Sequence, residues 1–251
     1  MVNFVGAGCG AADLITVRGK SIIEQADVIV YAGSLVNPQL LEYAKKDCRI
    51  HNSAYMTLEQ VIDVIKSAEH EKKMTVRLHT GDPSLYGAIR EQMDRLDKLG
   101  IKYDICPGVS SFCGAAAALR AEYTLPDVSQ TVIITRMAGR TPVPEKESIA
   151  TLAAHNATMV IFLSTGLLKE LSAELIRGGY KPDTPAAIVY KASWADQKVC
   201  RCTVKDLAQT AADNGITKTA LICVGYFLGN DYSLSKLYDK SFETEFRKAE
   251  I

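Results

Sequence analysis

The residue types best suited to chemistry lie in two short stretches, each placed where a predicted strand turns into a helix. The first reads G-D-P-S-L-Y-G over residues 81–87, and the second reads T-R-M-A-G-R-T-P-V-P-E over residues 135–145. The first pattern predicts a small-molecule site at a strand end. The second puts two arginines in a loop that two prolines stiffen. Guanidinium groups match carboxylates in a bidentate way, so this loop predicts a ligand with several carboxylates.

Asp82 has a structural interpretation when it is taken alone, as an N-cap followed by Pro83 in the first helical turn. A second loop, P-G-V-S-S over residues 107–111, follows the next predicted strand. Neighbouring strand ends of an open parallel sheet form the crevice where ligands bind. Two such loops therefore favour a binding site, in which Asp82 would accept hydrogen bonds from a ribose or an amine and favour a nearby cation.

The N-terminal loop reads G-A-G-C-G-A-A-D-L over residues 6–14. A dinucleotide fingerprint needs G-x-G-x-x-G and an acid at the end of the second strand. Position 11 is alanine, the second predicted strand ends without a carboxylate, and Asp27 precedes that strand instead. These departures disfavour a nicotinamide site. The glycines favour a ligand-lining loop, and the alternative is a tight strand-to-helix turn.

Composition restricts the class of protein. The chain has 251 residues, 47% of them hydrophobic and 23% charged, and a formal net charge of zero. Its length permits one large domain or two medium ones. A nucleic-acid binder usually carries a basic surplus, so no nucleic-acid partner is expected. No apolar run reaches the length of a membrane span, and the N-terminus lacks a signal peptide, so we expect no membrane association and a cytoplasmic location.

Metal and hydrolytic chemistry have little support in the sequence. The seven cysteines are scattered and are expected to be reduced thiols. Cys200 and Cys202 lie on one face of a predicted strand without another close ligand pair, and the four histidines show no metal-ligand spacing. We therefore expect no metal site. No nucleophile elbow or placed triad is present either.

The elements that must position these loops alternate between strand and helix. In the first half the expected strands are Val2–Val5, Val28–Tyr31, Met74–His79 and Lys102–Cys106, and the expected helices are Thr16–Gln25, Pro38–Lys45, Leu58–Glu69, Leu85–Leu99 and an alanine-rich helix through Leu119. Such alternation predicts a mostly parallel sheet with helices on its faces.

A linker over Arg120–Gln130 separates this half from a second series of strands and helices. Its expected strands are Thr131–Thr135, Met159–Leu163, Ala186–Tyr190, Lys198–Thr203 and Thr219–Tyr226. The pair around Trp194 could form an antiparallel hairpin, and the tail after Gly229 is expected to pack loosely. The predicted fold class is α/β, with two α/β domains and mostly parallel sheets, over residues 1–120 and 121–251.

Taken together, the motifs resemble those of the tetrapyrrole methylases, the S-adenosylmethionine-dependent enzymes of corrin and sirohaem synthesis. The opening G-A-G-x-G-x-x-x-L-I-T-V-R-G, then G-D-P-S-L-Y-G, P-G-V-S-S and T-R-x-x-G-R-T-P-V-P-E stand in the family's order and cover essentially the whole chain. The last motif resembles the corresponding motif of the family branch that methylates C-11 of precorrin-4 or cobalt-precorrin-4 on the route to cobalamin.

The resemblance implies a homodimer that holds S-adenosylmethionine between two α/β domains and releases S-adenosylhomocysteine. The donor-site residues that it implies are Cys9, Gly81, Asp82, Leu85, Ser110, Ser111, Leu163, Ala192 and Thr219. For the tetrapyrrole, we expect Arg136 and Arg140 to grip substrate carboxylates, Glu145 to orient these arginines, and Tyr86 to lie near the reacting centre. Cys9, Ala11 and Ala12 stand where proline, aspartate and proline are common in the family, which puts a catalytic role for that loop in doubt.

Three other functions remain as alternatives. A methylase of the same fold could act on uroporphyrinogen III or on ribosomal RNA, although zero net charge argues against RNA and the 135–145 loop favours the precorrin-4 branch. A non-catalytic tetrapyrrole carrier would not need the donor-site loops. A nicotinamide oxidoreductase lacks its ribose-binding acid.

Overall fold

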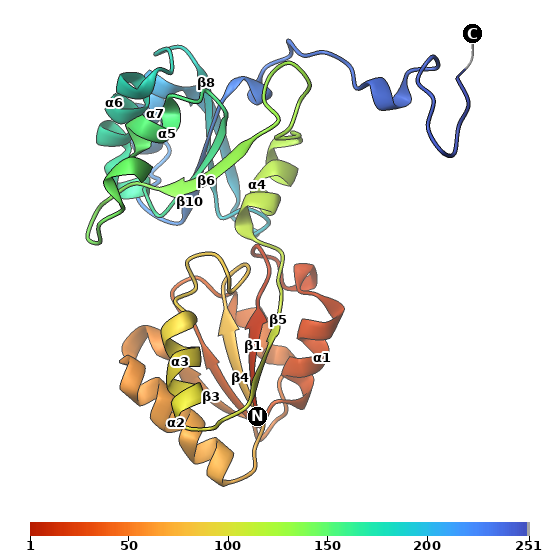
Figure 1. The fold of residues 1–251 in the computed structure, drawn as a ribbon. Helices are drawn as coiled ribbons and strands as arrows, with labels where there is room; N and C mark the ends of the chain where they lie inside the picture. Colours follow the sequence, from red (N-terminus) through yellow and green to blue (C-terminus); the bar gives the residue numbers. More distant parts are fainter. Residues whose placement is uncertain (250–251) are drawn as a thin grey trace. The chain divides into compact units, whose positions relative to one another are not determined.

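The computed structural model describes residues 1–249 and divides into two compact units (Figure 1). The first unit is Met1–Ala115 together with Lys191–Gln197, and the second is Ala116–Tyr190 together with the chain from Lys198 onward. The short segment Lys191–Gln197 thus belongs to the first unit although its neighbours in sequence belong to the second. The predicted domain limits, 1–120 and 121–251, stay a prediction.

The first unit is built on a five-stranded parallel sheet with the strand order β3-β2-β4-β1-β5. Its strands are β1 (Val2–Gly6), β2 (Val28–Tyr31), β3 (Arg49–Asn52), β4 (Thr75–His79) and β5 (Tyr103–Cys106). Strands β1, β2 and β4 are buried along most of their length, as expected for strands that are covered on both faces.

Helices cover both faces of this sheet, as Figure 1 shows. Its helices are α1 (Val17–Gln25), α2 (Leu58–His70) and α3 (Arg90–Lys98), with 3-10 turns at Ala12–Leu14, Pro38–Tyr43 and Ser53–Tyr55. Helix α4 (Ser111–Leu119) begins in the first unit and ends in the second. Ile23 of α1 packs with Val5 and Leu78 on one face. Ile65 of α2 and Leu96 of α3 pack with Phe4 and Val30 on the other. The apolar stripe of α2 begins at a capping box formed by Thr57 and Gln60.

The second unit contains another five-stranded sheet, with the order β6-β7-β10-β8-β9. Its strands are β6 (Val132–Arg136), β7 (Thr158–Phe162), β8 (Pro185–Tyr190), β9 (Lys198–Thr203) and β10 (Ala220–Val224). Strands β6 and β7 are parallel, whereas β10 is antiparallel to β7 and β8, and β8 is antiparallel to β9. The predicted hairpin around Trp194 is confirmed. The strand pairs of the two sheets together are mostly parallel, as predicted.

Three helices pack on one face of the second sheet. They are α5 (Ile149–Ala153), α6 (Leu168–Gly178) and α7 (Leu207–Asp213), and 3-10 turns occur at Glu145–Glu147, Thr165–Leu167, Val204–Asp206, Tyr226–Leu228 and Lys236–Tyr238. Leu171 and Leu175 of α6 and Leu207 of α7 are buried against Ile161 and Ile222 of the sheet. The core of this unit therefore lies between the sheet and these helices.

The structure differs from the prediction at three elements. The helix predicted over Pro38–Lys45 is a 3-10 helix, Pro38–Tyr43. The helix predicted over Leu85–Leu99 begins only at Arg90, and Pro83–Tyr86 form a turn instead. Tyr86 and Ala88 have φ angles of 56° and 50°, which an α-helix cannot contain. Strand β3 was not predicted, because an exposed edge strand of four residues carries no apolar pattern.

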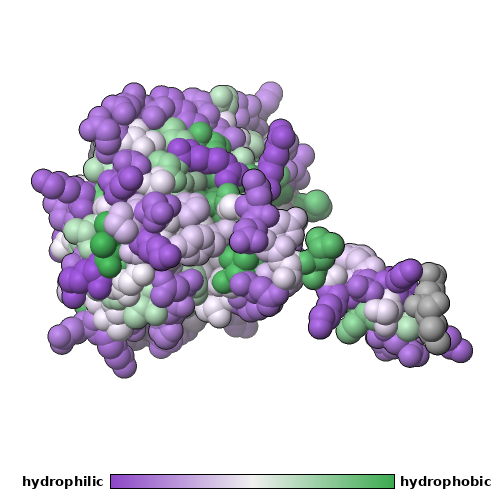
Figure 2. Space-filling model, turned by 90° about the horizontal axis from the view of Figure 1, so that it is seen from above, coloured by the Kyte–Doolittle hydropathy of each residue, from purple (hydrophilic) through white to green (hydrophobic). Residues whose placement is uncertain are grey.

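The surface hydropathy, the helix lengths and the state of the cysteines can be compared with what the composition predicted. Figure 2 shows hydrophilic residues interspersed with hydrophobic ones over the face in view. Within residues 1–249, no helix combines the length and the hydropathy required of a membrane span. All seven cysteines are free thiols.

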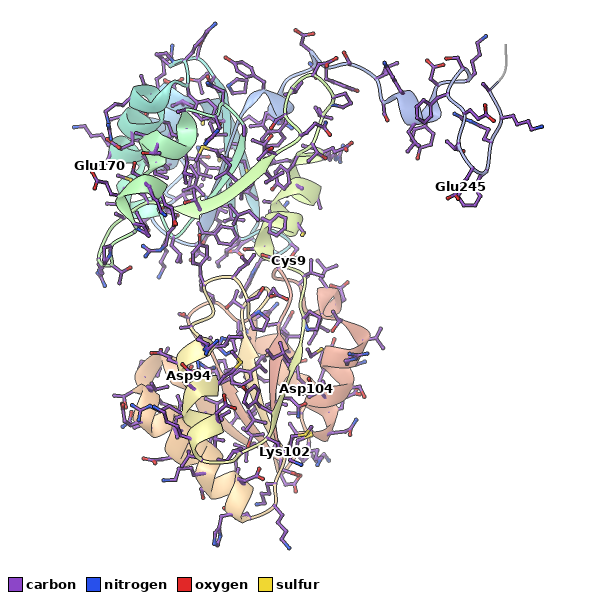
Figure 3. All side chains as sticks on the ribbon, in the orientation of Figure 1. Cys9, Asp94, Lys102, Asp104, Glu170 and Glu245 are labelled. Atoms are coloured by element: carbon purple, nitrogen blue, oxygen red, sulfur yellow. The ribbon has the colours of Figure 1, made fainter. Side chains whose placement is uncertain are left out.

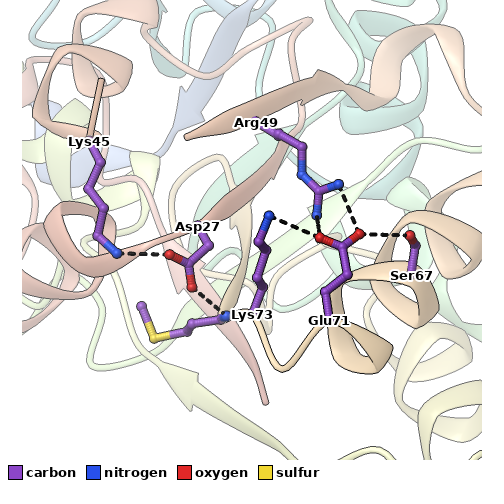
Figure 4. A network of polar contacts seen from close by, with 7 residues as sticks. Asp27, Lys45, Arg49, Ser67, Glu71 and Lys73 are labelled. Carbon is purple, nitrogen blue, oxygen red and sulfur yellow. Dashed lines mark hydrogen bonds and ion pairs between the residues drawn. The ribbon is translucent and has the colours of Figure 1, made fainter. Parts of the chain in front are cut away.

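A polar network ties together the amino ends of β2, β3 and β4 (Figure 4). The Glu71 carboxylate accepts two hydrogen bonds from Arg49, each at 3.1 Å, and lies 2.9 Å from Nζ of Lys73. Hydrogen bonds from Lys73 and Arg49 lower the pKa of Glu71 to about 2. Asp27 accepts hydrogen bonds from Lys45 at 2.9 Å and from the Met74 amide at 2.8 Å. Its carboxylate therefore stabilises the fold and is not placed to bind a ribose.

Replacing Glu71 by glutamine is expected to lower the Tm at neutral pH. The folded-state pKa of Glu71 lies below the ordinary value of 4.5, so its contribution is present above pH 4.5 and is lost as the pH falls towards 2. The Tm difference between the wild type and Glu71→Gln should therefore shrink over that interval in thermal melts at several pH values. Glu147→Gln, which changes an exposed carboxylate in a 3-10 turn, is the control. A Tm difference that is independent of pH would contradict this account.

Candidate functional site

Three neighbouring strands of the first unit end in a junction of glycine backbones. Gly6 ends β1, Gly81 follows β4 and Gly108 follows β5. A Cβ placed on Gly108 would lie 2.2 Å from the carbonyl oxygen of Gly81 and 2.7 Å from Cα of Gly6. Gly8 and Gly81 also exchange backbone hydrogen bonds of 3.3 and 2.9 Å. We call Gly6, Gly81 and Gly108 the glycine junction. It admits no side chain between these loops.

The Asp82 side chain joins two of these loops. One carboxylate oxygen, Oδ2, accepts from the Gly108 amide at 2.9 Å, while Oδ1 accepts from the Ser84 amide at 2.9 Å and from the Ser84 hydroxyl. Partial burial raises the pKa of Asp82, but these hydrogen bonds from Ser84 and Gly108 outweigh burial and hold the pKa below its usual value. Asp82 is thus a carboxylate near neutral pH. Its N-cap interpretation is wrong, because it closes a turn and does not begin a helix.

The two predicted serines lie beside the glycine junction at the start of α4. A Cβ on Gly81 would be 3.5 Å from Cα of Ser110 and 3.5 Å from the amide nitrogen of Ser111. Ser110 is buried, and its carbonyl accepts from the Cys113 amide at 3.0 Å. The N-terminal turn of α4 therefore presents backbone N–H groups next to the junction, an arrangement that suits negatively charged or polar ligand atoms.

Cys9 and Ala192 approach the same helix. Cys9 lies in the loop after β1 (Figure 3) and is 6% exposed. A Cβ on Gly114 of α4 would be 2.8 Å from Cβ of Cys9 and 3.4 Å from Cβ of Ala192. The Ser193 hydroxyl accepts from the Ala11 amide at 2.9 Å and contacts the Cys9 sulfur at 3.6 Å. Lys191–Gln197 therefore completes this part of the first unit.

Leu85 and Tyr86 lie in the loop that leads from the junction to α3. The Leu85 amide donates to the carbonyl of Asp82 at 3.2 Å, which closes the turn. Tyr86 is 45% exposed and has a positive φ. The first unit therefore brings together the predicted residues Cys9, Gly81, Asp82, Leu85, Tyr86, Ser110, Ser111 and Ala192 on loops at one end of its sheet.

In the second unit, Arg136 organises its own loop. It is the last residue of β6, and its guanidinium donates to the carbonyls of Thr141 at 3.2 Å and Pro142 at 2.7 Å. The Met137 amide donates to the Ser164 hydroxyl at 2.9 Å, which fixes the start of the loop to the end of β7. Arg136 thus shapes the loop that carries the second arginine.

Arg140 and Glu145 lie further out on the same loop and are both exposed. Glu145 begins the 3-10 turn Glu145–Glu147. Among the described residues, no ion pair or hydrogen bond joins Glu145 to Arg136 or Arg140. The predicted orienting role of Glu145 therefore has no contact behind it, whereas Arg140 is available to a ligand.

Leu163 and Thr219 lie at the same edge of the second sheet as Arg136. Strand β7 ends just before Leu163, and β10 begins just after Thr219. The antiparallel register, in which Ile161 is opposite Ile222, puts these two loops side by side. The Thr165 hydroxyl donates to the carbonyl of Ala220 at 3.2 Å and joins them.

Left-handed backbone occurs at several predicted site residues, and also at Lys72, Arg120, Asp127 and Asn156. Tyr86, Leu163 and Thr219 have φ angles of 56°, 52° and 59°. Lys191 and Ser193, on either side of Ala192, have φ angles of 46° and 66°. Such a conformation costs on the order of 1–3 kcal/mol for a non-glycine residue and persists where the surrounding structure imposes it, most often at functional sites.

Sequence reasoning missed two serines. Ser164 and Ser193 hold loop amides through their hydroxyls, but an isolated serine after a strand gives no distinctive sequence signal. Within residues 1–249, no three ligand-type side chains (histidine, cysteine, aspartate or glutamate) gather in a way that could hold a metal ion. Three features could hold an organic ligand: the glycine junction, the α4 N-terminus and the loop over residues 135–145, which carries Arg136 and Arg140 and which we call the arginine loop.

Comparison with known proteins assigns the chain to a group. A family model described as "Tetrapyrrole (Corrin/Porphyrin) Methylases" matches residues 1–208. The cobalt-precorrin-4 C(11)-methyltransferase of Methanocaldococcus jannaschii is 57% identical over 249 residues, which is 99% of this chain and 96% of that protein. The protein of the same name from Priestia megaterium is 48% identical over 249 residues, covering 97% of this chain and 96% of that protein.

The fold has a solved counterpart. The X-ray structure of a cobalamin biosynthetic enzyme, cobalt precorrin-4 methyltransferase, superposes with a TM-score of 0.89 at 47% sequence identity. The match covers 91% of this chain and 96% of that one. The predicted fold class is confirmed by this similarity.

Replacing Gly108 by alanine is expected to disrupt the glycine junction. The added methyl would meet the Gly81 carbonyl and Gly6 backbone, neither of which can rotate away, so we expect a loss of about 1–3 kcal/mol in the free energy of unfolding. Denaturant melts measure this loss. Gly166→Ala is the matched control, since a Cβ there meets nothing within 4 Å. Equal stability of both variants would contradict the close approach of the three loops.

Proposed function

The chain belongs to the tetrapyrrole (corrin/porphyrin) methylases, and we propose that it transfers a methyl group from S-adenosylmethionine to C-11 of cobalt-precorrin-4 or precorrin-4 in cobalamin biosynthesis. The observation that carries this proposal is the extent of the similarity to cobalt-precorrin-4 C(11)-methyltransferases. It spans 249 residues and therefore includes both the loops of the first unit and the arginine loop of the second.

The first unit has the features that a methyl donor of this kind needs. The glycine junction lets the three loops approach one another closely, and Gly81, with a φ of 62°, makes its turn without strain. The α4 N-terminus beside Ser110 and Ser111 suits a carboxylate, and the Asp82 carboxylate favours a nearby cation. We propose that these residues, with Cys9, Leu85, Leu163, Ala192 and Thr219, line the donor site.

The arginine loop is proposed to bind the tetrapyrrole. Arg140 is exposed and makes no ion pair within residues 1–249, so its guanidinium can grip a substrate carboxylate. Arg136 holds the loop in shape through Thr141 and Pro142 and has further N–H groups to offer. Tyr86 is proposed to lie near the reacting carbon, and Glu145 to orient Arg136 and Arg140.

The chemistry asks the protein mainly for alignment. When bound, S-adenosylmethionine supplies a methyl group activated on a sulfonium cation. The loops at the glycine junction and the arginine loop would each hold one reactant in a fixed position. Orientation of two reactants can contribute roughly 7–11 kcal/mol to lowering a barrier in favourable cases. Because the acceptor carbon is already nucleophilic in the conjugated ring, the proposal needs no strong general base from the chain.

Two alternatives share part of this proposal. A uroporphyrinogen III methylase would use the same donor loops, but the loop over residues 135–145 resembles the precorrin-4 branch. A non-catalytic tetrapyrrole-binding protein would have no need of the donor loops.

We further propose a homodimer, as the family resemblance implies, which light scattering would test. The seven free thiols suit the reducing cytoplasm, which is the proposed location.

The proposed function is tested by anaerobic incubation with S-adenosylmethionine and precorrin-4, with and without cobalt, followed by mass spectrometry. The gain of one methyl on either tetrapyrrole is expected, and the preferred form assigns the pathway branch. Methylation of uroporphyrinogen III instead would support the first alternative. Donor binding without methylation of any of these substrates would contradict the assigned substrate.

Replacing Arg140 by alanine is expected to weaken tetrapyrrole binding selectively. Loss of one charge-assisted contact of about 1.5–3 kcal/mol corresponds to a KM for the tetrapyrrole that rises on the order of 10- to 100-fold. Affinity for S-adenosylhomocysteine, measured by calorimetry, should stay unchanged. Lys146→Ala removes another exposed cation from the same segment and should leave both constants near wild type. Equal loss of donor affinity in Arg140→Ala would overturn its assignment.

A further inference from the structure

A buried arginine without an acidic partner lies in the parallel sheet of the first unit. Arg77 belongs to β4 and is 7% exposed. Its Nε donates to Oε1 of Gln92 at 3.0 Å, and Nη1 donates to the carbonyl of Val30 at 3.1 Å. Among the ion pairs of residues 1–249 none involves Arg77, and burial alone lowers its pKa to about 10. The guanidinium therefore stays charged at neutral pH.

A buried charge of this kind is costly for the fold. Removing a cation from water costs several kcal/mol unless an anion or a full set of acceptors compensates, and here two neutral oxygens accept from it. Burial and the nearby Arg77 charge also lower the pKa of His79, two residues along β4, to about 3. The arrangement calls for a role beyond stability.

The second partner of Gln92 indicates that role. Gln92 is 5% exposed in α3, and its Nε2 donates to the carbonyl of Ala88 at 3.0 Å. Since Oε1 is already fixed by Arg77, the amide of Gln92 has one orientation, and its N–H is aimed at Ala88. Hydrogen bonds thus run without a break from Val30 in β2 through Arg77 and Gln92 to Ala88.

Ala88 belongs to the loop that links the glycine junction to α3. Both Ala88 and Tyr86 have positive φ angles, so this part of the loop needs an external support to hold its shape. The other end of the loop is held separately, by the Asp82 contacts with Ser84 and Gly108. The loop is therefore fixed at two independent places, one beside the proposed donor site and one beside Tyr86.

We propose that Arg77 and Gln92 are positioning residues that fix the Tyr86–Ala88 part of the loop for the tetrapyrrole substrate. The buried charge orients the Gln92 amide, and that amide holds the strained backbone. The kinetic consequence rests on the proposed function, whereas the effect on the loop backbone does not.

The variant Gln92→Glu separates positioning from stability. A carboxylate at position 92 still accepts from Arg77, and pairs its charge, but it cannot donate to Ala88. We expect a Tm equal to or above that of the wild type. Backbone amides of residues 84–89 should exchange with deuterium on the order of five- to tenfold faster, which is the effect of losing one hydrogen bond. The KM for the tetrapyrrole should rise about tenfold, while affinity for S-adenosylhomocysteine stays within about twofold.

A matched control is available in α1. Gln25 makes the same kind of bond, from Nε2 to the carbonyl of Ser21 four residues earlier, at 3.1 Å, but it is exposed and distant in sequence from the site loops. Gln25→Glu should leave exchange at residues 84–89 and the KM unchanged. If Gln92→Glu does not fold, Gln92→Met, which also lacks the donor, serves for the exchange measurement.

The outcomes distinguish this inference from the proposed function. Unchanged exchange at residues 84–89 in Gln92→Glu would overturn the positioning role, whatever the reaction. Faster exchange with a wild-type KM would also overturn it, because the loop would then have no part in substrate binding. Faster exchange in a chain whose wild type transfers no methyl group would retain the effect on the loop and reject the proposed function instead.

Discussion

Three strand ends of the first unit meet with no side chain between them, and the candidate donor site depends on that contact. The backbones of Gly6, Gly81 and Gly108 approach one another closely. A methyl group on Gly6 or on Gly108 would overlap a neighbouring backbone. This close approach brings the start of α4 beside Gly81 and lets the Asp82 carboxylate reach the Gly108 amide. The site is therefore built mainly from backbone, and few side chains are needed to define it.

Around the glycine junction, short polar contacts hold loops that would otherwise be free to move. Ser193 fixes the loop after β1, Asp82 joins two further loops, and Gln92 supports the backbone at Ala88. In the second unit, Arg136 does the same for its own loop by binding two carbonyls. Ala88 and Ser193, which have positive φ angles, both take part in such contacts.

The sequence predicted the alternation of strands and helices well, because the buried strands carry continuous apolar runs and α2 carries a clear apolar stripe. It failed at Leu85–Ile89, where the chain adopts a loop in place of the expected first turns of a helix. A hydrogen bond from Gln92 of α3 to the Ala88 carbonyl holds that conformation, and Gln92 is itself oriented by Arg77 of β4. For the same reason the motifs indicated Gly81 and Ser110, but not Ser193 or Gln92, whose roles depend on partners distant in the sequence or on the buried charge of Arg77.

If the loops at the glycine junction form the methyl-donor site, bound S-adenosylhomocysteine protects them, and a deuterium-exchange footprint of this ligand is the decisive measurement. The measurement compares the chain with and without saturating ligand, in the absence of tetrapyrrole. We expect protection at residues 8–11, 81–85 and 108–114, with little change at the amino ends of β2, β3 and β4. Protection that avoids these three loops, or no binding at all, would contradict this placement of the donor site.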